Sequence, residues 1–451
     1  MWNSIRIFAH GGAARAYNKD ENIEDGTRIS NFASRLFTLG EHFNRVPYLS
    51  GKRIPHRSDY IVTLDSPEKY RDCTTFTGYK PCYPGVDCSE QCRDPRPFGM
   101  RILVVSLDAM GAVLMTTAQL EGLRRAYPES TVFWVTRPAA MPLLQGNPFL
   151  HRVLPWTDEQ RMVLQQMEFD LVLNADKSVG ACAFVNTLRA REVRGFRLNT
   201  AGQIIPANPE AEYSYRLGLD DELKFRRNTR TGQDILAEAW KLPYARAEYV
   251  LVLSPEEGTF CREKRREWGL EEADLVVGFN TGCSDLFPNK KMTVAQHLEL
   301  IRRLARRPGV RVLLLGGRED TERNARIADM AMAEGIEVVN TPTTEGLRRG
   351  ICYENLADVV ITGDTLGMHI AIGLRKHVLA WFGLSCQAEI DLYERGKKFY
   401  REDLECSPCW KRECPHNLEC ISGIDLDAIE QAVWTYLETR TIVSSSAGVD
   451  S

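Results

Sequence analysis

The sequence of 451 residues lacks any long apolar run and any large excess of charge. No window of about eighteen apolar residues occurs, which argues against a membrane-spanning helix. The N-terminal stretch also lacks the apolar core that a signal peptide needs. A formal net charge of -4 at pH 7 provides no field that attracts nucleic acid. These absences predict a cytoplasmic protein that binds no nucleic acid.

The sequence also lacks the even number of cysteines expected of a disulfide framework. It has 13 cysteines, and eight of them lie in two clusters. Clustered thiols in a reducing compartment favour metal binding, so we expect structural zinc, or iron, at each cluster. Free thiols are the alternative, and iron–sulfur ligation stays open for the first cluster. The clusters are Cys73, Cys82, Cys88 and Cys92, then Cys406, Cys409, Cys414 and Cys420, with His416 inside the second.

Regular patterning begins only at Met100. Before it, charged and apolar residues mix without a sustained period, apart from one helical stretch at 29–43. After it, short apolar strands alternate with amphipathic helices, which predicts the α/β class with two successive doubly wound domains. We expect four regions: an irregular extension at 1–99, one domain at 100–254, a second domain at 255–400, and a cysteine-rich loop, helix and disordered tail at 401–451.

The stretch from Val359 to Phe382 has the pattern that best indicates a ligand site. Val359–Thr362 suits a buried parallel strand, and the polar break Gly363–Gly367 precedes a helical pattern. Free N–H groups and the positive end of the dipole at such a helix start favour an anion such as phosphate. An ordinary turn capped by Asp364 is the alternative.

Three other loops follow predicted strands and should meet this turn at a cleft between the two domains. Asp108 in the first loop can act as a general base, and Lys290 in the second can hold a diphosphate, so we predict these two as catalytic. Glu319 in the third can accept hydrogen bonds from ribose. The predicted substrate-binding residues are Gly111, Thr281, Gly282, Lys291, Gly317, Glu319, Asp364, Thr365, Leu366, Gly367 and His369. The alternative for His369 is that it faces no ligand and is a histidine of the first helical turn whose hydrogen bonds are satisfied within the protein. Together the loops favour a sugar-nucleotide site.

Four segments in this order resemble glycosyltransferase family 9, the ADP-heptose:lipopolysaccharide heptosyltransferases. They are RILVVSLDAMGAVLMTT, GFNTGCSDLFPNKKMT, VLLLGGREDTERN and VVITGDTLGMHIAIGLRKHVLAWFG, and the resemblance extends over about residues 100–430. It implies the GT-B fold, in which two Rossmann-like domains face each other across a cleft and a C-terminal helix crosses back to the first domain. It also implies an inverting transfer that needs no catalytic metal.

The resemblance further implies where an ADP-sugar would bind. The diphosphate would lie against Thr281, Lys290 and the turn 364–367, the adenosine near Gly317 and Glu319, and His369 would line the site.

One position departs from the family pattern. Well-known heptosyltransferases have the catalytic aspartate directly after the Met-Gly of the first loop, where this sequence has Ala112. Asp108 in the same loop is the nearest carboxylate and our candidate for the base. Asp176, at the end of a predicted strand, is the alternative.

These features lead to one hypothesis and two alternatives. The hypothesis is an inverting transfer of a heptose, or a related sugar, from an ADP-sugar to a glycan or glycolipid acceptor such as a lipopolysaccharide core. The enzyme would act in the cytoplasm with peripheral contact at the inner membrane face. The first alternative is a GT-B-fold scaffold protein that has lost transfer activity and is stabilised by metal. The second is a sugar-nucleotide epimerase on the same fold.

Overall fold

The computed structural model describes residues 72–82, 96–284 and 286–447. The chain divides into two compact units, residues 6–97 and residues 1–5 with 98–451, which are described separately. In the described part of the first unit, 72–82 and 96–97, there is no helix or strand, and the backbone N–H of Thr74 donates to the carbonyl of Arg96 at 2.7 Å. The helical stretch expected at 29–43 lies outside the described residues.

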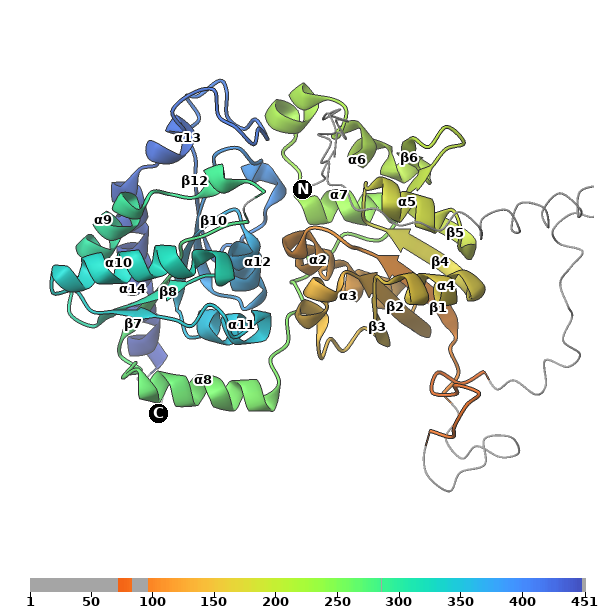
Figure 1. Ribbon diagram of the computed structural model, residues 1–451, viewed down its shortest axis with the longest axis horizontal. Coiled ribbons are helices and arrows are strands. Elements are labelled where there is room, and N and C mark those ends of the chain that lie inside the picture. Colours follow the sequence, from red (N-terminus) through yellow and green to blue (C-terminus); the bar gives the residue numbers. More distant parts are fainter. Residues whose placement is uncertain (1–71, 83–95, 285, 448–451) are drawn as a thin grey trace, which may run out of the picture. The chain divides into compact units, whose positions relative to one another are not determined.

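The second unit begins with a Rossmann-like lobe (Figure 1). Its strands are β1 (Met100–Val105), β2 (Ser130–Thr136), β3 (Arg152–Pro155), β4 (Glu168–Asn174), β5 (Arg189–Leu198) and β6 (Ile204–Pro206). Its α-helices are α2 (Met110–Thr116), α3 (Gln119–Ala126), α4 (Asp158–Gln166), α5 (Val179–Val185), α6 (Glu212–Arg216) and α7 (Gly232–Ala239). The sheet order is β3-β2-β1-β4-β5-β6, and all neighbours are parallel except β5 and β6.

A second Rossmann-like lobe follows. Its strands are β7 (Leu275–Asn280), β8 (Val310–Leu315), β9 (Val338–Asn340), β10 (Val359–Gly363), β11 (His377–Trp381) and β12 (Gly396–Phe399). Its α-helices are α8 (Pro255–Glu267), α9 (Val294–Leu304), α10 (Thr321–Ala333), α11 (Leu347–Asn355), α12 (Leu366–Gly373), α13 (Glu419–Ser422) and α14 (Leu426–Ala447). The order β12-β11-β10-β7-β8-β9 repeats that of the first lobe, so the α/β class and the two doubly wound domains are confirmed.

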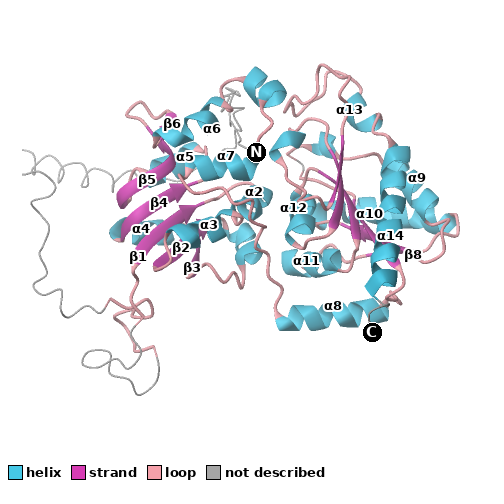
Figure 2. Cartoon of the chain, turned by 180° about the vertical axis from the view of Figure 1, so that it is seen from behind, coloured by secondary structure: helices cyan, strands magenta, loops and turns pink. Residues whose placement is uncertain are grey.

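Helices cover both faces of each sheet (Figure 2), because the strands bury side chains on both faces. In β1, Ile102 and Val104 belong to one hydrophobic cluster, whereas Leu103 and Val105 belong to another. The first of these clusters continues into the second lobe, where it includes Ile370 of α12. The two lobes therefore share part of their core.

The helical segment after β1 is divided into α2 and α3, because the hydroxyls of Thr116 and Thr117 donate to carbonyls of α2. One detail differs from what the family resemblance implied. The helix α14 does not cross back to the first lobe. Its Ile429 and Val433 are buried in the hydrophobic cluster of the second lobe, where α14 packs against α9 and β11.

None of the helices in the described ranges has both the length and the apolar composition needed to cross a bilayer.

Candidate functional site

A cavity of about 780 Å³ lies where the carboxyl ends of the strands of both lobes meet. It sits at the two points where the strand order reverses, between β1 and β4 and between β7 and β10, where ligands of such sheets bind. The lining includes 109–111 after β1, parts of 280–290 after β7, 315–320 after β8, parts of 341–347 after β9 and parts of 364–370 after β10. The structure thus brings together the four predicted loops and adds the loop after β9.

A buried ion pair marks one end of this cavity. The ammonium of Lys290 donates to the Asp364 carboxylate at 2.8 Å and to the Asp364 carbonyl at 3.0 Å. Helix α12 begins two residues later, and the side chain of Thr365 at its N-cap position does not cap the helix. The Thr365 hydroxyl instead accepts a hydrogen bond from the Asn280 amide at 2.7 Å. The first turn of α12 therefore offers N–H groups to an anion beside a lysine.

The charge states of Asp364 and His369 at this end follow from burial and from the ion pair. Burial alone would raise the pKa of Asp364, but the charge and hydrogen bond of Lys290, with smaller contributions from His369 and Ser385, together outweigh it and hold that pKa below its ordinary value. Burial lowers the pKa of His369 to about 4, so the imidazole is neutral at pH 7. Its Nδ1 lies 3.3 Å from the Tyr249 hydroxyl, and its Nε2 is buried without a partner among the described residues.

The glycines of the predicted loops make room for protein side chains. A Cβ on Gly282 would lie 1.8 Å from Oδ1 of Asp320, and one on Gly367 would lie 2.0 Å from Nδ2 of Asn280. A Cβ on Gly111 would lie 2.4 Å from Cδ2 of His369, which comes from the other lobe. Gly111 thus allows α2 and α12 to approach each other.

The loops after β8 and β9 line another part of the cavity. Gly317 and Glu319 line it, together with Thr341–Thr344 and residues of α11, and their predicted contact with a nucleoside stays a prediction. Glu354 of α11 also lines the cavity and is 4% exposed. Burial raises its pKa well above the ordinary value, which favours a neutral carboxyl group.

Three predicted residues do not line the cavity. The Thr281 hydroxyl is fully buried and donates to Asn324, and the Lys291 ammonium lies 3.9 Å from the Asp320 carboxylate. Asp108 is half-exposed, and both of its carboxylate oxygens accept hydrogen bonds from Arg137, at 2.7 and 2.9 Å. Its chain neighbours Ala109–Gly111 do line the cavity, so Asp108 stands at the rim.

The alternative base, Asp176, is buried behind this rim. It is 4% exposed, and its carboxylate accepts a hydrogen bond from the backbone N–H of Leu107. Burial raises its pKa to about 7, and the nearby charge of Asp108 adds to the rise. Asp176 does not line the cavity either, so its contacts are those of a structural residue.

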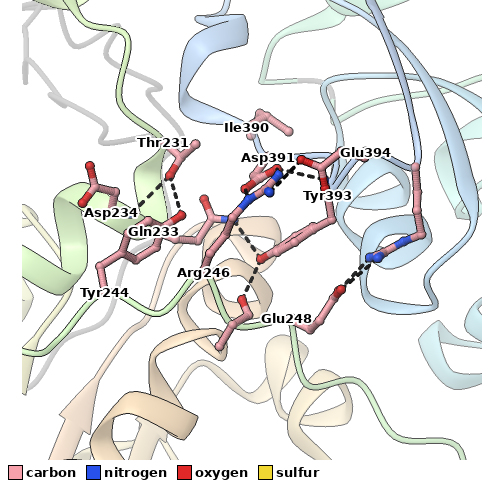
Figure 3. A network of polar contacts seen from close by, with 12 residues as sticks. Thr231, Gln233, Asp234, Tyr244, Arg246, Glu248, Ile390, Asp391, Tyr393 and Glu394 are labelled. Atoms are coloured by element: carbon pink, nitrogen blue, oxygen red, sulfur yellow. Dashed lines mark hydrogen bonds and ion pairs between the residues drawn. The ribbon is translucent and has the colours of Figure 1, made fainter.

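A polar network holds the segment that joins the lobes (Figure 3). The guanidinium of Arg246 binds both oxygens of Asp391, at 2.6 and 2.8 Å, and the hydroxyl of Tyr393 donates to the carbonyl of Ala247 at 2.8 Å. From the first lobe, the amide of Gln233 donates to the Tyr393 hydroxyl at 3.2 Å. The same segment carries Tyr249, which contacts His369 in the cavity.

Comparison with known proteins decides the family. The model of "glycosyltransferase family 9 (heptosyltransferase)" matches residues 160–419, which is more than half of the chain. The chain belongs to glycosyltransferase family 9. It is therefore a glycosyltransferase, and the family that its four segments resemble is confirmed. No curated protein sequence matches it at a significant level.

Solved structures with the same fold include other family 9 proteins. A family 9 glycosyltransferase from Veillonella parvula has a TM-score of 0.59 at 19% identity, covering 75% of this chain and 97% of the other. The E. coli ADP-heptose lipopolysaccharide heptosyltransferase II has a TM-score of 0.54 at 16% identity, with 76% and 100% covered. E. coli heptosyltransferase WaaC with ADP has a TM-score of 0.50 at 18% identity, with 75% and 98% covered. These likenesses confirm the GT-B fold.

Trp410 and Glu354 are among the cavity residues of this glycosyltransferase that were not predicted. Trp410 lines the cavity from within the second cysteine cluster, where the thiols dominate the pattern. Glu354 lies on a helix whose sequence carries no signal that separates it from a solvent-exposed glutamate. Only the three-dimensional placement identifies either residue.

The predicted metal sites of the glycosyltransferase stay predictions. Among the described residues, no group of three or more His, Cys, Asp or Glu side chains is arranged to hold a metal ion. In the first cluster, Cys88 and Cys92 lie outside the described residues. In the second, burial raises the pKa of Cys420 to about 11, and the nearby thiols of Cys406, Cys409 and Cys414 add to the rise.

Proposed function

We propose that this enzyme transfers a heptose, or a related sugar, from an ADP-sugar to a hydroxyl group of a glycan or glycolipid acceptor such as a lipopolysaccharide core. One observation carries the proposal: the ion pair of Lys290 and Asp364 lies at the start of α12, inside a cavity at the strand switch points of both lobes. Lysine and a helix N-terminus are the groups that bind a diphosphate. Membership of family 9 and the likeness to an ADP-heptose lipopolysaccharide heptosyltransferase support the choice of donor and acceptor.

In the proposed reaction, an acceptor hydroxyl attacks the anomeric carbon of the sugar. The bond from that carbon to the diphosphate oxygen breaks, and ADP leaves. Lys290 and the first turn of α12 stabilise the charge that grows on the leaving diphosphate. Asp108 takes the proton of the acceptor from its place at the rim of the first lobe. Gly317 and Glu319 bind the adenosine.

The test is the release of ADP from ADP-heptose by the purified chain with a truncated lipopolysaccharide core as acceptor. The expected result is ADP release that depends on the acceptor, with a mass gain of one heptose on the glycan. Parallel reactions with ADP-glucose and UDP-glucose identify the sugar and the base that the enzyme prefers. ADP binding without transfer to any acceptor would contradict the proposal.

The scaffold alternative has one observation in its favour. Ala112 stands at the position where the family carries its aspartate, and the nearest carboxylate is paired with Arg137. A scaffold would bind ADP and yield no ADP from ADP-heptose even at high enzyme concentration. The transfer assay therefore separates the two functions.

The proposal also includes the metals and the place of action. The transfer needs no metal, because Lys290 and the helix N-terminus supply the positive charge, so added Mg²⁺ or EDTA should leave the initial rate unchanged.

The cysteines of the second cluster bind a structural zinc or iron ion, which elemental analysis of the purified chain would detect. The acceptor is met at the inner membrane face, so the chain should sediment with vesicles that contain the glycolipid acceptor and not with vesicles that lack it.

A further inference from the structure

The loop from Cys406 to Cys420, here called the cysteine-rich loop, holds Trp410 in a constrained position. The backbone N–H groups of Cys409 and Trp410 both donate to the carbonyl of Leu384, at 3.1 and 2.9 Å. Trp410 itself has a φ of +52°, which is rare for a bulky residue. Such strain persists only where the surroundings enforce it, and it is often found at functional sites.

Both lobes help to hold the cysteine-rich loop. In the second lobe, the amide of Asn289 donates to the carbonyl of Lys411 in the loop at 2.8 Å. The carbonyl of Gly383 accepts a hydrogen bond from the hydroxyl of Ser407 in the loop at 2.7 Å. From the first lobe, the guanidinium of Arg226 donates to the carbonyl of Ser407 at 2.9 Å. The position of Trp410 is therefore fixed relative to both sides of the cavity.

The indole ring of Trp410 lies among groups of the donor site. It packs edge to face against Phe287, with the ring centres 5.4 Å apart. The ammonium groups of Lys290 and Lys224 each lie 5.0 Å from the Trp410 ring centre. Cation–π attraction thus helps to hold the lysine that the proposed function places against the diphosphate.

A second, much smaller cavity of about 10 Å³ adjoins the main one. Asp364 and Trp410 line both cavities, and Ser385 and Cys386 line only the smaller one. The smaller cavity has room for about one water-sized group. It therefore forms a niche beside the ion pair of Lys290 and Asp364.

Two polar atoms near this niche have no hydrogen-bond partner. The Nε1–H of Trp410 is buried without an acceptor among the described residues, and the Oδ1 of Asp364 is buried without a donor. The Cys386 thiol lies beside the indole and the Ser385 hydroxyl beside the carboxylate, and both contacts are close enough to oppose the rise that burial causes in the pKa of Cys386 and of Asp364. Nε1 of Trp410 and Oδ1 of Asp364 are nevertheless left without a hydrogen bond of good geometry among the described residues. The other Asp364 oxygen is already bound by Lys290. An unsatisfied buried donor or acceptor costs about 1–3 kcal/mol, so a ligand that satisfies both would bind there favourably.

The chemistry of these two atoms selects the kind of group. The indole N–H can only donate, and the carboxylate oxygen can only accept. A hydroxyl group does both, so it can accept from Trp410 and donate to Asp364. A phosphate has only acceptors and a negative charge that the Asp364 carboxylate repels. The pair therefore matches a sugar hydroxyl and not the diphosphate.

We propose that a hydroxyl group of the transferred sugar binds between Nε1–H of Trp410 and Oδ1 of Asp364, which makes Trp410 a specificity-determining residue of the donor site. This inference rests on the proposed function, because it takes the main cavity as the site of an ADP-sugar. It also gives the cysteine-rich loop a role, which is to carry a wall of the donor site.

The test compares the affinities of ADP and ADP-heptose for Trp410→Phe by calorimetry. Phenylalanine keeps an aromatic ring for the two lysines and removes the N–H. The affinity for ADP-heptose should fall about 3- to 10-fold, which corresponds to one hydrogen bond, and the affinity for ADP should change less than about 2-fold. The retained ADP affinity also shows that the variant is folded.

A panel of monodeoxy ADP-heptoses identifies the hydroxyl. The wild-type chain should bind one deoxy donor more weakly than ADP-heptose, by the same factor by which Trp410→Phe lowers the affinity for ADP-heptose. Combining that donor with Trp410→Phe should produce no further loss, because both changes remove the same contact. The matched control is Trp434→Phe on α14, whose indole N–H donates to Glu430 at 3.2 Å, and it should bind both ligands as the wild type does.

The possible results have distinct meanings. Equal losses for ADP and ADP-heptose would overturn the inference, because Trp410 would then act only through Lys290 or the nucleotide. Unchanged affinity for both would also overturn it and would point to a structural water between the two atoms. Failure of the wild-type chain to bind either ligand would overturn the proposed function itself, and the inference with it.

Discussion

The two walls of the cavity differ in what they present to a ligand. The wall from the second lobe carries the buried charges of Lys290 and Asp364 and the start of α12. The wall from the first lobe consists of Ala109–Gly111 and Ala139, with no charged side chain among the lining residues. On the proposed function, the donor half is therefore preformed, whereas the acceptor half depends on groups at its rim.

In the proposed mechanism, the rim carries the chemistry of the first lobe. Asp108 is half-exposed and held by Arg137, so it can reorient without a buried charge being left unpaired. Asp364 lacks this freedom, because it is 4% exposed and its charge depends on Lys290. A rigid donor wall opposite an adjustable rim suits an enzyme whose acceptor is larger and more variable than its donor. Variants on each wall should therefore fail in different ways.

The largest effect is expected at the rim. Asp108→Asn should lower kcat about 10²- to 10⁴-fold, which is the usual worth of a general base. ADP affinity should stay near that of the wild type, because Asp108 does not line the cavity. Steady-state kinetics and ADP titration measure the two quantities.

The matched control for Asp108 is Asp158→Asn on α4, which removes another exposed carboxylate that is paired with an arginine, Arg161. It should leave turnover unchanged. Full activity of Asp108→Asn would show that the base lies elsewhere and would end the distinction between rim and donor wall.

The next largest effect is expected on the donor wall. Lys290→Met should reduce kcat/KM about 10²- to 10³-fold, because one electrostatic contact to the leaving group is lost, and it should weaken ADP binding. It should also destabilise the fold by roughly 3–5 kcal/mol, since the Asp364 charge is left buried and unpaired. Thermal unfolding and kinetics separate the two losses.

The double variant Lys290→Met/Asp364→Asn sharpens the test of the donor wall. It should regain much of the stability, because no buried charge is left, and none of the activity. The control is Lys291→Met, whose ammonium lies outside the cavity lining and should be nearly silent in turnover. Recovery of activity by the double variant would mean that Lys290 acts only as the partner of Asp364.

Much of the fold could be predicted from the sequence, because strands buried on both faces read as continuous apolar runs. Met100–Val105 and Val359–Gly363 are of this kind, and the polar turns after them mark the cavity. The division between α2 and α3 could not be predicted from the sequence. It depends on hydrogen bonds from the hydroxyls of Thr116 and Thr117 to backbone carbonyls, and not on proline or glycine.

The site could be predicted to the level of its loops but not of its side-chain directions. Lys290 and Thr281 follow the same strand, yet Lys290 lines the cavity, whereas Thr281 turns to Asn324 in the core. The pattern of the sequence is the same whichever way a side chain points. Trp410 could not be predicted because its loop has no periodicity, and its place depends on contacts with Leu384 and Asn289.

A moderate effect is expected where the two walls touch. Gly111→Ala places a methyl group 2.4 Å from Cδ2 of His369, so α2 and α12 must separate slightly. Overpacking of this kind lowers the free energy of unfolding by about 1–3 kcal/mol, which thermal unfolding would measure. Adding His369→Ala should relieve the steric part of the loss, as a double-mutant cycle would show. Gly180→Ala, where a Cβ meets nothing within 4 Å, is the silent control.

The smallest effect on turnover is expected at Asp176, whose role shows in the pH dependence of stability. The folded chain keeps the Asp176 proton until about pH 7, whereas the unfolded chain releases it near the ordinary pKa of 3.8. The contribution of Asp176 to stability is therefore complete below pH 3.8 and is lost as the pH rises through 7. Asp176→Asn should remove this loss. The urea midpoint of unfolding of the wild type should therefore fall relative to that of the variant as the pH rises from 4 to 7.5. Its kcat should stay near the wild-type value, because the amide oxygen of the substituted side chain can still accept the N–H of Leu107. A large fall in kcat, with the two stability curves parallel, would instead assign the base to Asp176 and move the chemistry of the first lobe from its rim to its interior.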